Sequence, residues 1–122
     1  MKVVLSGSGM RYPAHVGALK AILDSGIHIT EIAGVSGGAI IAAAYASGWG
    51  FDDQIKSLES LVADTLPGPN NLIDKSYWPF SAPYGVIKGM KLLKQFEKVF
   101  VRNLENTQIP LHILTTDLET GG

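Results

Sequence analysis

The sequence predicts an α/β fold in which helices sandwich a mostly parallel β-sheet. Segments with strand and helix patterns alternate along the 122 residues, which is the order typical of parallel sheets. Two of the expected strands run directly into glycine-rich turns, as strand-to-helix connections often do. Hydrophobic residues make up 46% of the chain and charged residues 17%, a composition typical of a packed core. We therefore expect residues 1–122 to belong to a single domain.

The first strand and the first helix are expected near the N-terminus. Residues 2–6 form a short run rich in β-branched side chains, and residues 7–9 follow as a Gly-Ser-Gly loop. Pro13 suits the first position of a helix, where its missing N–H leaves no hydrogen bond unmade. Apolar residues then recur at helical spacing until Gly26, a residue type that commonly ends helices.

A second strand and helix flank the most glycine-rich turn of the chain. Apolar and polar residues alternate over residues 27–35 enough to predict a strand, which stops at Ser-Gly-Gly, residues 36–38. Residues 39–47 are helix-forming and almost wholly apolar. Such a helix must be buried on nearly all sides.

The rest of the chain contains two helical patterns, a long loop and a last strand. Residues 51–63 are amphipathic, residues 64–83 are rich in Pro, Gly, Asn and Ser, and residues 84–102 resume a helical period. Residues 110–116 read as a third strand, followed by a turn at residues 117–122. Long loops in compact domains are usually functional or mobile.

Neither a secretion signal nor a membrane span is expected. The N-terminus carries one positive charge and a three-residue apolar run, whereas a signal needs ~7–15 apolar residues. Twenty residues without charge lie between Glu31 and Asp52, but five of them are glycines, each of which costs ~1 kcal/mol in a helix. We therefore expect a cytoplasmic protein or one that binds peripherally to a membrane.

The composition also excludes several classes of function. Ten Lys and Arg against eleven Asp and Glu give a net charge of −1, which provides no electrostatic footprint for nucleic acid. The absence of cysteine excludes disulfides, thiolate metal sites and a thiol nucleophile. Histidines and carboxylates do not cluster at ligand spacing, so neither a metal nor another cofactor is expected.

The sequence Gly34-Val35-Ser36-Gly37-Gly38 matches the pattern G-x-S-x-G where a strand passes into a helix. In an enzyme this sharp turn lifts the serine hydroxyl out of the backbone, and small neighbours prevent clashes. The N-terminus of the following helix directs amide N–H groups at a developing oxyanion. The alternative is a glycine-rich turn whose serine caps the helix. On this motif alone the two interpretations are balanced.

A second glycine loop, Gly7-Ser8-Gly9-Met10-Arg11, follows the first strand. Because the carboxyl ends of parallel strands lie at one sheet edge, this loop is expected to face Ser36 across a crevice and to offer amides to an oxyanion. The alternatives are an ordinary turn or a dinucleotide fingerprint. Tyr12 occupies the third glycine position of that fingerprint, and no acidic residue ends the second strand. Nucleotide binding therefore ranks below acyl chemistry.

Together these motifs resemble the patatin-like phospholipase family. The glycine loop with its basic residue, the Ala14-His15-Val16-Gly17 stretch and the serine motif follow in the family's order. Near the end, Asp117-Leu118-Glu119-Thr120-Gly121 is similar to the family's Asp-x-x-Thr-Gly strand exit. The resemblance covers the whole chain. Ser8 and Tyr12 depart from it, since glycine is usual at both positions.

The resemblance implies a serine acyl hydrolase that cleaves fatty-acyl esters of phospholipids or other lipids. Ser36 would be the nucleophile, with Gly34 and Gly38 in the nucleophile elbow. Arg11 is a candidate anion contact, with a salt bridge as the simpler alternative. The oxyanion hole would be formed by backbone groups of Gly7, Ser8, Gly9, Met10 and Gly37.

A serine nucleophile needs a base, which in this family is the aspartate of an Asp-Gly-Gly or Asp-Gly-Ala motif, forming a Ser–Asp dyad. No Asp-Gly occurs in the sequence, and the family pattern places it after Gly122. We therefore expect the N-terminal part of a patatin-like domain, truncated after its third core strand, inactive alone and prone to associate. We expect Asp117 to be a turn carboxylate, and structural roles for His15, His28 and His112.

Two surface features suggest contact with lipid, and two other functions remain open. The aromatic residues of the long loop are candidates for an interface, with packing onto the core an equal alternative. Lysines at helical spacing form a solvated face or attract anionic lipid. A non-catalytic lipid-binding or interaction domain is the main alternative to an enzyme, followed by a nucleotide-binding βαβ unit. The residues of the two surface features are Tyr77, Trp78, Phe80, Lys88, Lys91, Lys94 and Lys98.

Overall fold

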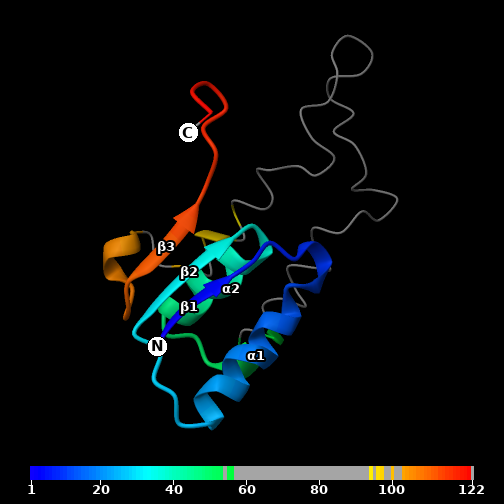
Figure 1. Ribbon diagram of the computed structural model, residues 1–122, viewed down its shortest axis with the longest axis vertical. Helices are drawn as coiled ribbons and strands as arrows, with labels where there is room; N and C mark the ends of the chain where they lie inside the picture. Colours follow the sequence, from blue (N-terminus) through cyan, green and yellow to red (C-terminus); the bar gives the residue numbers. More distant parts are fainter. Residues whose placement is uncertain (54, 57–93, 95, 98–99, 101–102, 122) are drawn as a thin grey trace. The chain divides into compact units, whose positions relative to one another are not determined.

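The computed structural model describes residues 1–53, 55–56, 94, 96–97, 100 and 103–121 (Figure 1). The chain divides into two compact units, one formed by Met1–Ile55 with Phe100–Gly122 and the other by Lys56–Val99. The helices and strands discussed below belong to the first unit. In the second unit the structure describes four residues with helical backbone conformation: Lys56, Lys94, Phe96 and Glu97.

Three parallel strands form the sheet, in the order β1-β2-β3 (Figure 1). They are β1 (Lys2–Leu5), β2 (Glu31–Val35) and β3 (Leu111–Leu114). Leu5 lies opposite Gly34, which in turn lies opposite Ile113. The carboxyl ends of all three strands therefore meet at one edge of the sheet, and the predicted α/β fold with a parallel sheet is confirmed.

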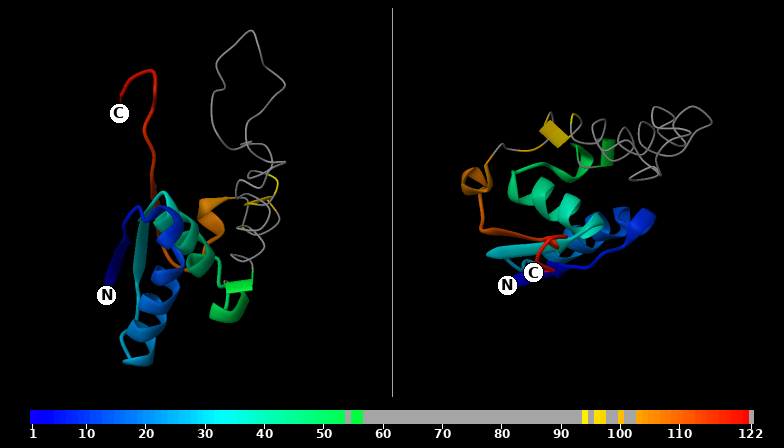
Figure 2. Two further views of the ribbon diagram at one scale, coloured as in Figure 1. Left: turned by 90° about the vertical axis from the view of Figure 1, so that its right-hand side faces the viewer. Right: turned by 90° about the horizontal axis from the view of Figure 1, so that it is seen from above.

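Two helices cover one face of this sheet. Helix α1 (Pro13–Asp24) connects β1 to β2, and α2 (Gly37–Ala46) follows β2. With strands in the order β1-β2-β3, right-handed crossovers place both helices on the same side, as Figure 2 shows. The residues that the structure describes place no helix on the opposite face, where Val4 is 74% and Leu114 59% exposed. The expected helical cover is thus seen on one face.

The hydrophobic core is formed by the sheet together with helices α1 and α2. Leu19, Ile29, Ile32 and Ile41 are fully buried. Helix α2 is buried along most of its length, as its apolar composition predicts, and its small side chains allow a close approach to β2. Its buried residues are Gly37, Gly38, Ile41, Ala42, Ala43, Ala44 and Ala46.

Several element boundaries differ from the sequence-based prediction. The second strand begins at Glu31 rather than at residue 27, and α2 begins at Gly37, two residues before the expected start. A short 3-10 helix, η3 (Leu104–Asn106), was not predicted. The end of α1 agrees with prediction, because Gly26 has a φ of +79° and its N–H donates to the Leu23 carbonyl.

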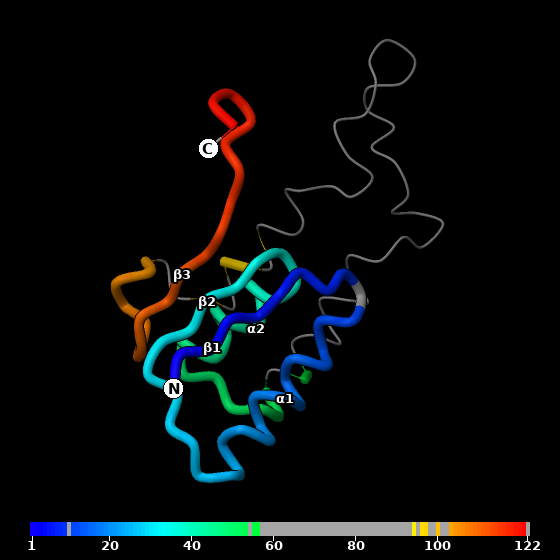
Figure 3. Tube along the Cα trace, in the orientation of Figure 1, coloured from blue at the N-terminus to red at the C-terminus, as the bar shows by residue number. Residues whose placement is uncertain are grey.

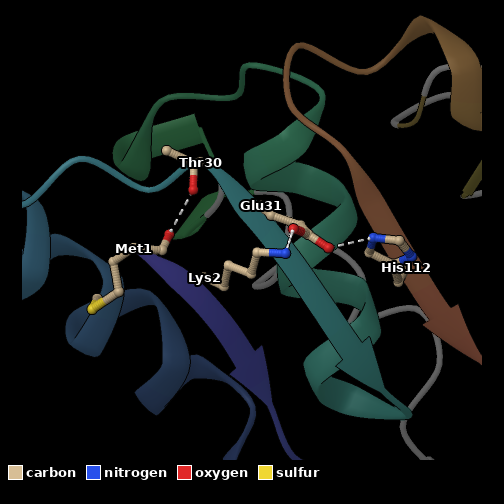
Figure 4. A network of polar contacts seen from close by, with 5 residues as sticks. All are labelled: Met1, Lys2, Thr30, Glu31 and His112. Atoms are coloured by element: carbon tan, nitrogen blue, oxygen red, sulfur yellow. Dashed lines mark hydrogen bonds and ion pairs between the residues drawn. The ribbon is translucent and has the colours of Figure 1, made fainter.

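A polar network ties the three strands together at the end where each begins (Figure 4). The Glu31 carboxylate on β2 contacts Lys2 Nζ of β1 at 2.5 Å and His112 Nε2 of β3 at 2.8 Å. The hydrogen bond from Lys2 holds the pKa of Glu31 below its ordinary value, with His112 adding to the effect. Nearby, the Thr30 N–H and hydroxyl both donate to the Met1 carbonyl.

Several predictions fall on residues outside those described. Of the helix expected at residues 51–63, residues 51–53 and 55–56 are described and are helical. The aromatic loop residues Tyr77, Trp78 and Phe80 lie outside the described part, as do most of residues 84–102, although Lys94 is described and exposed. No helix within the described ranges is long and apolar enough to cross a bilayer.

Candidate active site

Ser36 occupies a strained turn between β2 and α2. Its φ of 51° and ψ of −123° make it the one non-glycine residue with positive φ in the described part of the chain. A side chain held in such a region costs ~1–3 kcal/mol, so surrounding structure must enforce it. The residue is exposed at the carboxyl edge of the sheet. This is the backbone geometry that the G-x-S-x-G pattern predicts at a strand-to-helix turn.

The side chain of Ser36 does not cap the helix. Ser36 stands at the N-cap of α2, where a capping serine would accept a hydrogen bond through its hydroxyl, but it makes none. Its carbonyl instead accepts the Ala39 N–H at 2.9 Å and the Ile40 N–H at 3.4 Å. The backbone thus starts the helix, and the structure does not show the alternative in which this serine is a cap.

Glycines around Ser36 permit contacts that no other residue allows. A Cβ at Gly34 would lie 2.6 Å from the backbone N and Cα of Ala39, where α2 crosses over the strand. One at Gly38 would lie 2.5 Å from the Ser6 carbonyl oxygen. One at Gly37 would lie 2.9 Å from both Ser8 Oγ and Tyr12 Cβ. Real Cβ atoms do not approach other atoms so closely, so the turn requires glycine at each position.

The loop after β1 lies directly against this turn (Figure 3). A Cβ built at Gly7 would be 3.7 Å from Ser36 Cβ. Gly9 has a φ of +50°, and the Arg11 N–H donates to the Ser8 carbonyl as the 3-10 helix η1 (Gly9–Arg11) begins. Among the described residues, no protein group accepts a hydrogen bond from the N–H of Gly7, Ser8 or Gly9.

The two departures from the family pattern are both packed inward. Ser8 Oγ is buried against Gly37 and has no hydrogen-bond partner among the described residues. Tyr12 is 6% exposed, and burial raises the pKa of its phenol. Ser8 Oγ and Tyr12 Cβ thus both lie against Gly37 at the start of α2.

The basic residue of the loop, Arg11, lies at the surface of the chain. Arg11 is exposed in the last turn of η1, and it forms no ion pair with any residue that the structure describes. The salt-bridge alternative is therefore not seen there. Met10 belongs to the same turn of η1 through its backbone.

Each of the three histidines makes a polar contact with a residue other than Ser36. His15 Nε2 lies 3.0 Å from the Ser6 carbonyl oxygen, His112 contacts Glu31, and the His28 carbonyl accepts the N-terminal amine of Met1 at 2.6 Å. The sequence did not predict the contact of His15, which joins helix α1 to the segment before the glycine loop. The Ala-His-x-Gly stretch was the only signal that pointed to this residue.

Asp117 stabilises its own turn. Its Oδ1 accepts the Glu119 N–H at 2.9 Å and its Oδ2 accepts the Thr120 hydroxyl at 2.6 Å. These hydrogen bonds hold the pKa of Asp117 below its ordinary value, and the bond from the Thr120 hydroxyl has the largest effect. The residue is a turn carboxylate, as the sequence predicts. Within the described ranges, no group of three or more His, Asp or Glu side chains is placed to hold a metal ion.

Comparison with known proteins gives one family. A family model described as patatin-like phospholipase matches residues 3–117. An uncharacterized protein of Acanthamoeba polyphaga mimivirus is 34% identical over 126 residues, which cover 95% of this chain and 41% of that protein. Neuropathy target esterase sws is 32% identical in Drosophila persimilis and 31% in Drosophila willistoni, over 95% of this chain and 8% of each relative. The chain thus spans less than half the length of these relatives.

Proposed function

The chain belongs to the patatin-like phospholipase family, a family of lipid hydrolases, and from this premise we propose that it carries the nucleophile of a serine acyl hydrolase. The backbone of Ser36 is the observation that carries the proposal. This serine is strained and exposed, and its hydroxyl does not cap the helix. Strain of this kind is typical of functional sites, where it aims a side chain at a substrate.

In the proposed reaction, Ser36 Oγ adds to the carbonyl carbon of a fatty-acyl ester while its proton passes to a base. The ester C–O bond then breaks, the leaving alcohol takes up the proton, and an acyl-enzyme forms. Water hydrolyses this ester by the same route, releasing the fatty acid and restoring the serine. Backbone N–H groups of the loop and of the helix start stabilise the oxyanion in both steps, namely those of Gly7, Ser8, Gly9, Met10 and Gly37.

We place the base, an aspartate forming a Ser–Asp dyad, in a part of the protein outside this chain. Two observations support this placement. The carboxylate of Asp117 is already engaged by Glu119 and Thr120 within its turn. The chain also spans 41% of the mimivirus relative and 8% of the esterases, so most of a relative's length has no counterpart in it. Residues 1–122 would then form the N-terminal part of the hydrolase domain.

The proposed substrates are fatty-acyl esters, including those of phospholipids, met at a membrane surface. Arg11 supports this choice, because an exposed guanidinium beside the glycine loop adds positive potential where a phosphate group would approach. Arginine also matches phosphate geometry through paired hydrogen bonds. No metal or other cofactor takes part in this mechanism.

The proposal is tested by labelling with a serine-directed fluorophosphonate. In the complete protein that contains this chain, we expect a covalent adduct on Ser36 and hydrolysis of a short-chain p-nitrophenyl ester. Ser36→Ala should remove both while leaving the far-ultraviolet circular dichroism unchanged. A folded wild-type protein without ester hydrolysis and without label would contradict the proposal and would favour the non-catalytic lipid-binding function.

A further inference from the structure

A histidine outside the serine motif is bonded to the loop that faces it. His15 lies in the first turn of α1 and is half-buried, and its Nε2 lies 3.0 Å from the Ser6 carbonyl oxygen. A carbonyl oxygen can only accept a hydrogen bond, so Nε2 carries the proton and donates it. Helix α1 is thereby fixed to the segment between β1 and the glycine loop.

The bonded carbonyl belongs to the same peptide unit as a candidate oxyanion donor. Ser6 C=O and Gly7 N–H share one peptide plane, and in a trans peptide the two groups point in opposite directions. Fixing the direction of the carbonyl therefore fixes the direction of the N–H. Gly7 is the loop residue that lies beside Ser36, since a Cβ on it would be 3.7 Å from Ser36 Cβ. The N–H of Gly7 bonds to no protein group among those described.

Among the residues that the structure describes, no second hydrogen bond orients the Ser6–Gly7 peptide. The Ser6 carbonyl also faces Gly38, where a Cβ would lie 2.5 Å from the oxygen, but this contact involves no donor. Gly7 has no side chain to anchor it, and glycine is the residue with the widest choice of backbone conformations. The hydrogen bond from His15 is thus the interaction that selects one orientation of the peptide.

We propose that His15 is a positioning residue that orients the Gly7 N–H toward the oxyanion formed at Ser36. This inference rests on the proposed acyl-hydrolase function. His15 acts through the Ser6–Gly7 peptide and touches no reacting atom. Its Nε2 is occupied as a donor, so it is not the base.

The test compares three variants of the complete protein. The amide nitrogen of glutamine stands as many bonds from the backbone as His Nε2, whereas that of asparagine matches Nδ1 and falls short of Ser6. His15→Gln should therefore keep kcat within a few-fold of wild type. His15→Asn and His15→Leu should lower kcat on a p-nitrophenyl ester by about 10- to 100-fold with KM little changed, since loss of one whole oxyanion donor costs ~10²–10³.

A second readout separates orientation of the donor from general damage to the fold. A catalytic serine adds to the carbonyl of a trifluoromethyl ketone, and the adduct carries a tetrahedral oxyanion. The affinity for this inhibitor should therefore fall by the same factor as kcat in His15→Asn and should be unchanged in His15→Gln. Rates are normalised to the folded fraction from circular dichroism. Equal kcat in wild type and all three variants, or equal loss in the glutamine and asparagine variants, would overturn the inference. An inactive wild-type protein would instead overturn the proposed function.

Discussion

Replacing Ser36 by alanine and by glycine should separate the strain of the turn from the chemistry of its hydroxyl. Ser36→Ala removes the hydroxyl and keeps Cβ. Because Ser36 makes no capping hydrogen bond, this change should alter the free energy of unfolding by less than about 0.5 kcal/mol. Ser36→Gly also removes Cβ and with it the ~1–3 kcal/mol of strain at φ 51°. The extra freedom of glycine in the unfolded chain offsets ~0.5–1 kcal/mol of that gain.

The glycine variant is therefore expected to be more stable than the alanine variant, by up to about 2.5 kcal/mol. Urea denaturation of the two variants in the complete protein, followed by circular dichroism, measures this difference directly. Both variants lack the hydroxyl of the proposed nucleophile, so both are expected to be inactive. A glycine variant that is less stable than the alanine variant would show that the turn is not strained. A loss of about 1 kcal/mol in Ser36→Ala would show that the serine is a helix cap after all.

Three further predictions follow from the packing and the charges. Gly38→Ala should destabilise the fold by about 1–3 kcal/mol and lower ester hydrolysis at least tenfold, because the new Cβ would lie 2.5 Å from the Ser6 carbonyl oxygen. Gly17→Ala is the control: a Cβ at this position in α1 meets open space, so this variant should have a higher melting temperature than wild type. Because the pKa of Glu31 is lowered in the folded state, the ionised carboxylate stabilises the fold above about pH 4.3. The melting temperature of wild type should therefore exceed that of Glu31→Gln by its largest amount at neutral pH, and this difference should shrink as the pH falls below about 4.3. The isolated 122-residue chain should hydrolyse no p-nitrophenyl ester, and turnover through Ser36 would contradict the assignment of the base to another part of the protein.

The elements next to the glycine turns were the most predictable from sequence. A glycine at a strand end or a helix end constrains the backbone locally, so Gly26 and the 34–38 pattern located the end of α1 and the start of α2 to within two residues. The predicted start of the second strand was wrong, because a short alternating pattern does not distinguish a strand from the segment that precedes it. Residues 27–30 alternate like a strand, but they precede β2, which begins at Glu31; Ile29 is buried, whereas Ile27 is 42% exposed. A short run of alternating apolar and polar residues therefore establishes neither a strand nor the burial of its apolar side chains.

The candidate site was predictable in its residues and less so in its contacts. Parallel topology placed the glycine loop and Ser36 at one edge, because the carboxyl ends of neighbouring parallel strands must meet. The hydrogen bond from His15 to Ser6 depends on how α1 is set against the loop, and no local pattern encodes that angle. Likewise, nothing in the sequence shows that Tyr12 is buried against Gly37.

The contacts across this edge explain how serine is accommodated where the family usually has glycine. Ser8 Oγ lies 2.9 Å from the point where a Cβ of residue 37 would stand, so it occupies space that exists only because residue 37 is glycine. The loop after β1 and the turn after β2 therefore constrain each other, although they lie far apart in the sequence. Ser8→Gly should be tolerated, because it only vacates this space and removes a buried, unpaired hydroxyl. Gly37→Ala should be tolerated better in the Ser8→Gly background than in the wild-type background, and a double-mutant cycle on unfolding free energy measures that coupling. Strictly additive effects would show that loop and elbow pack independently.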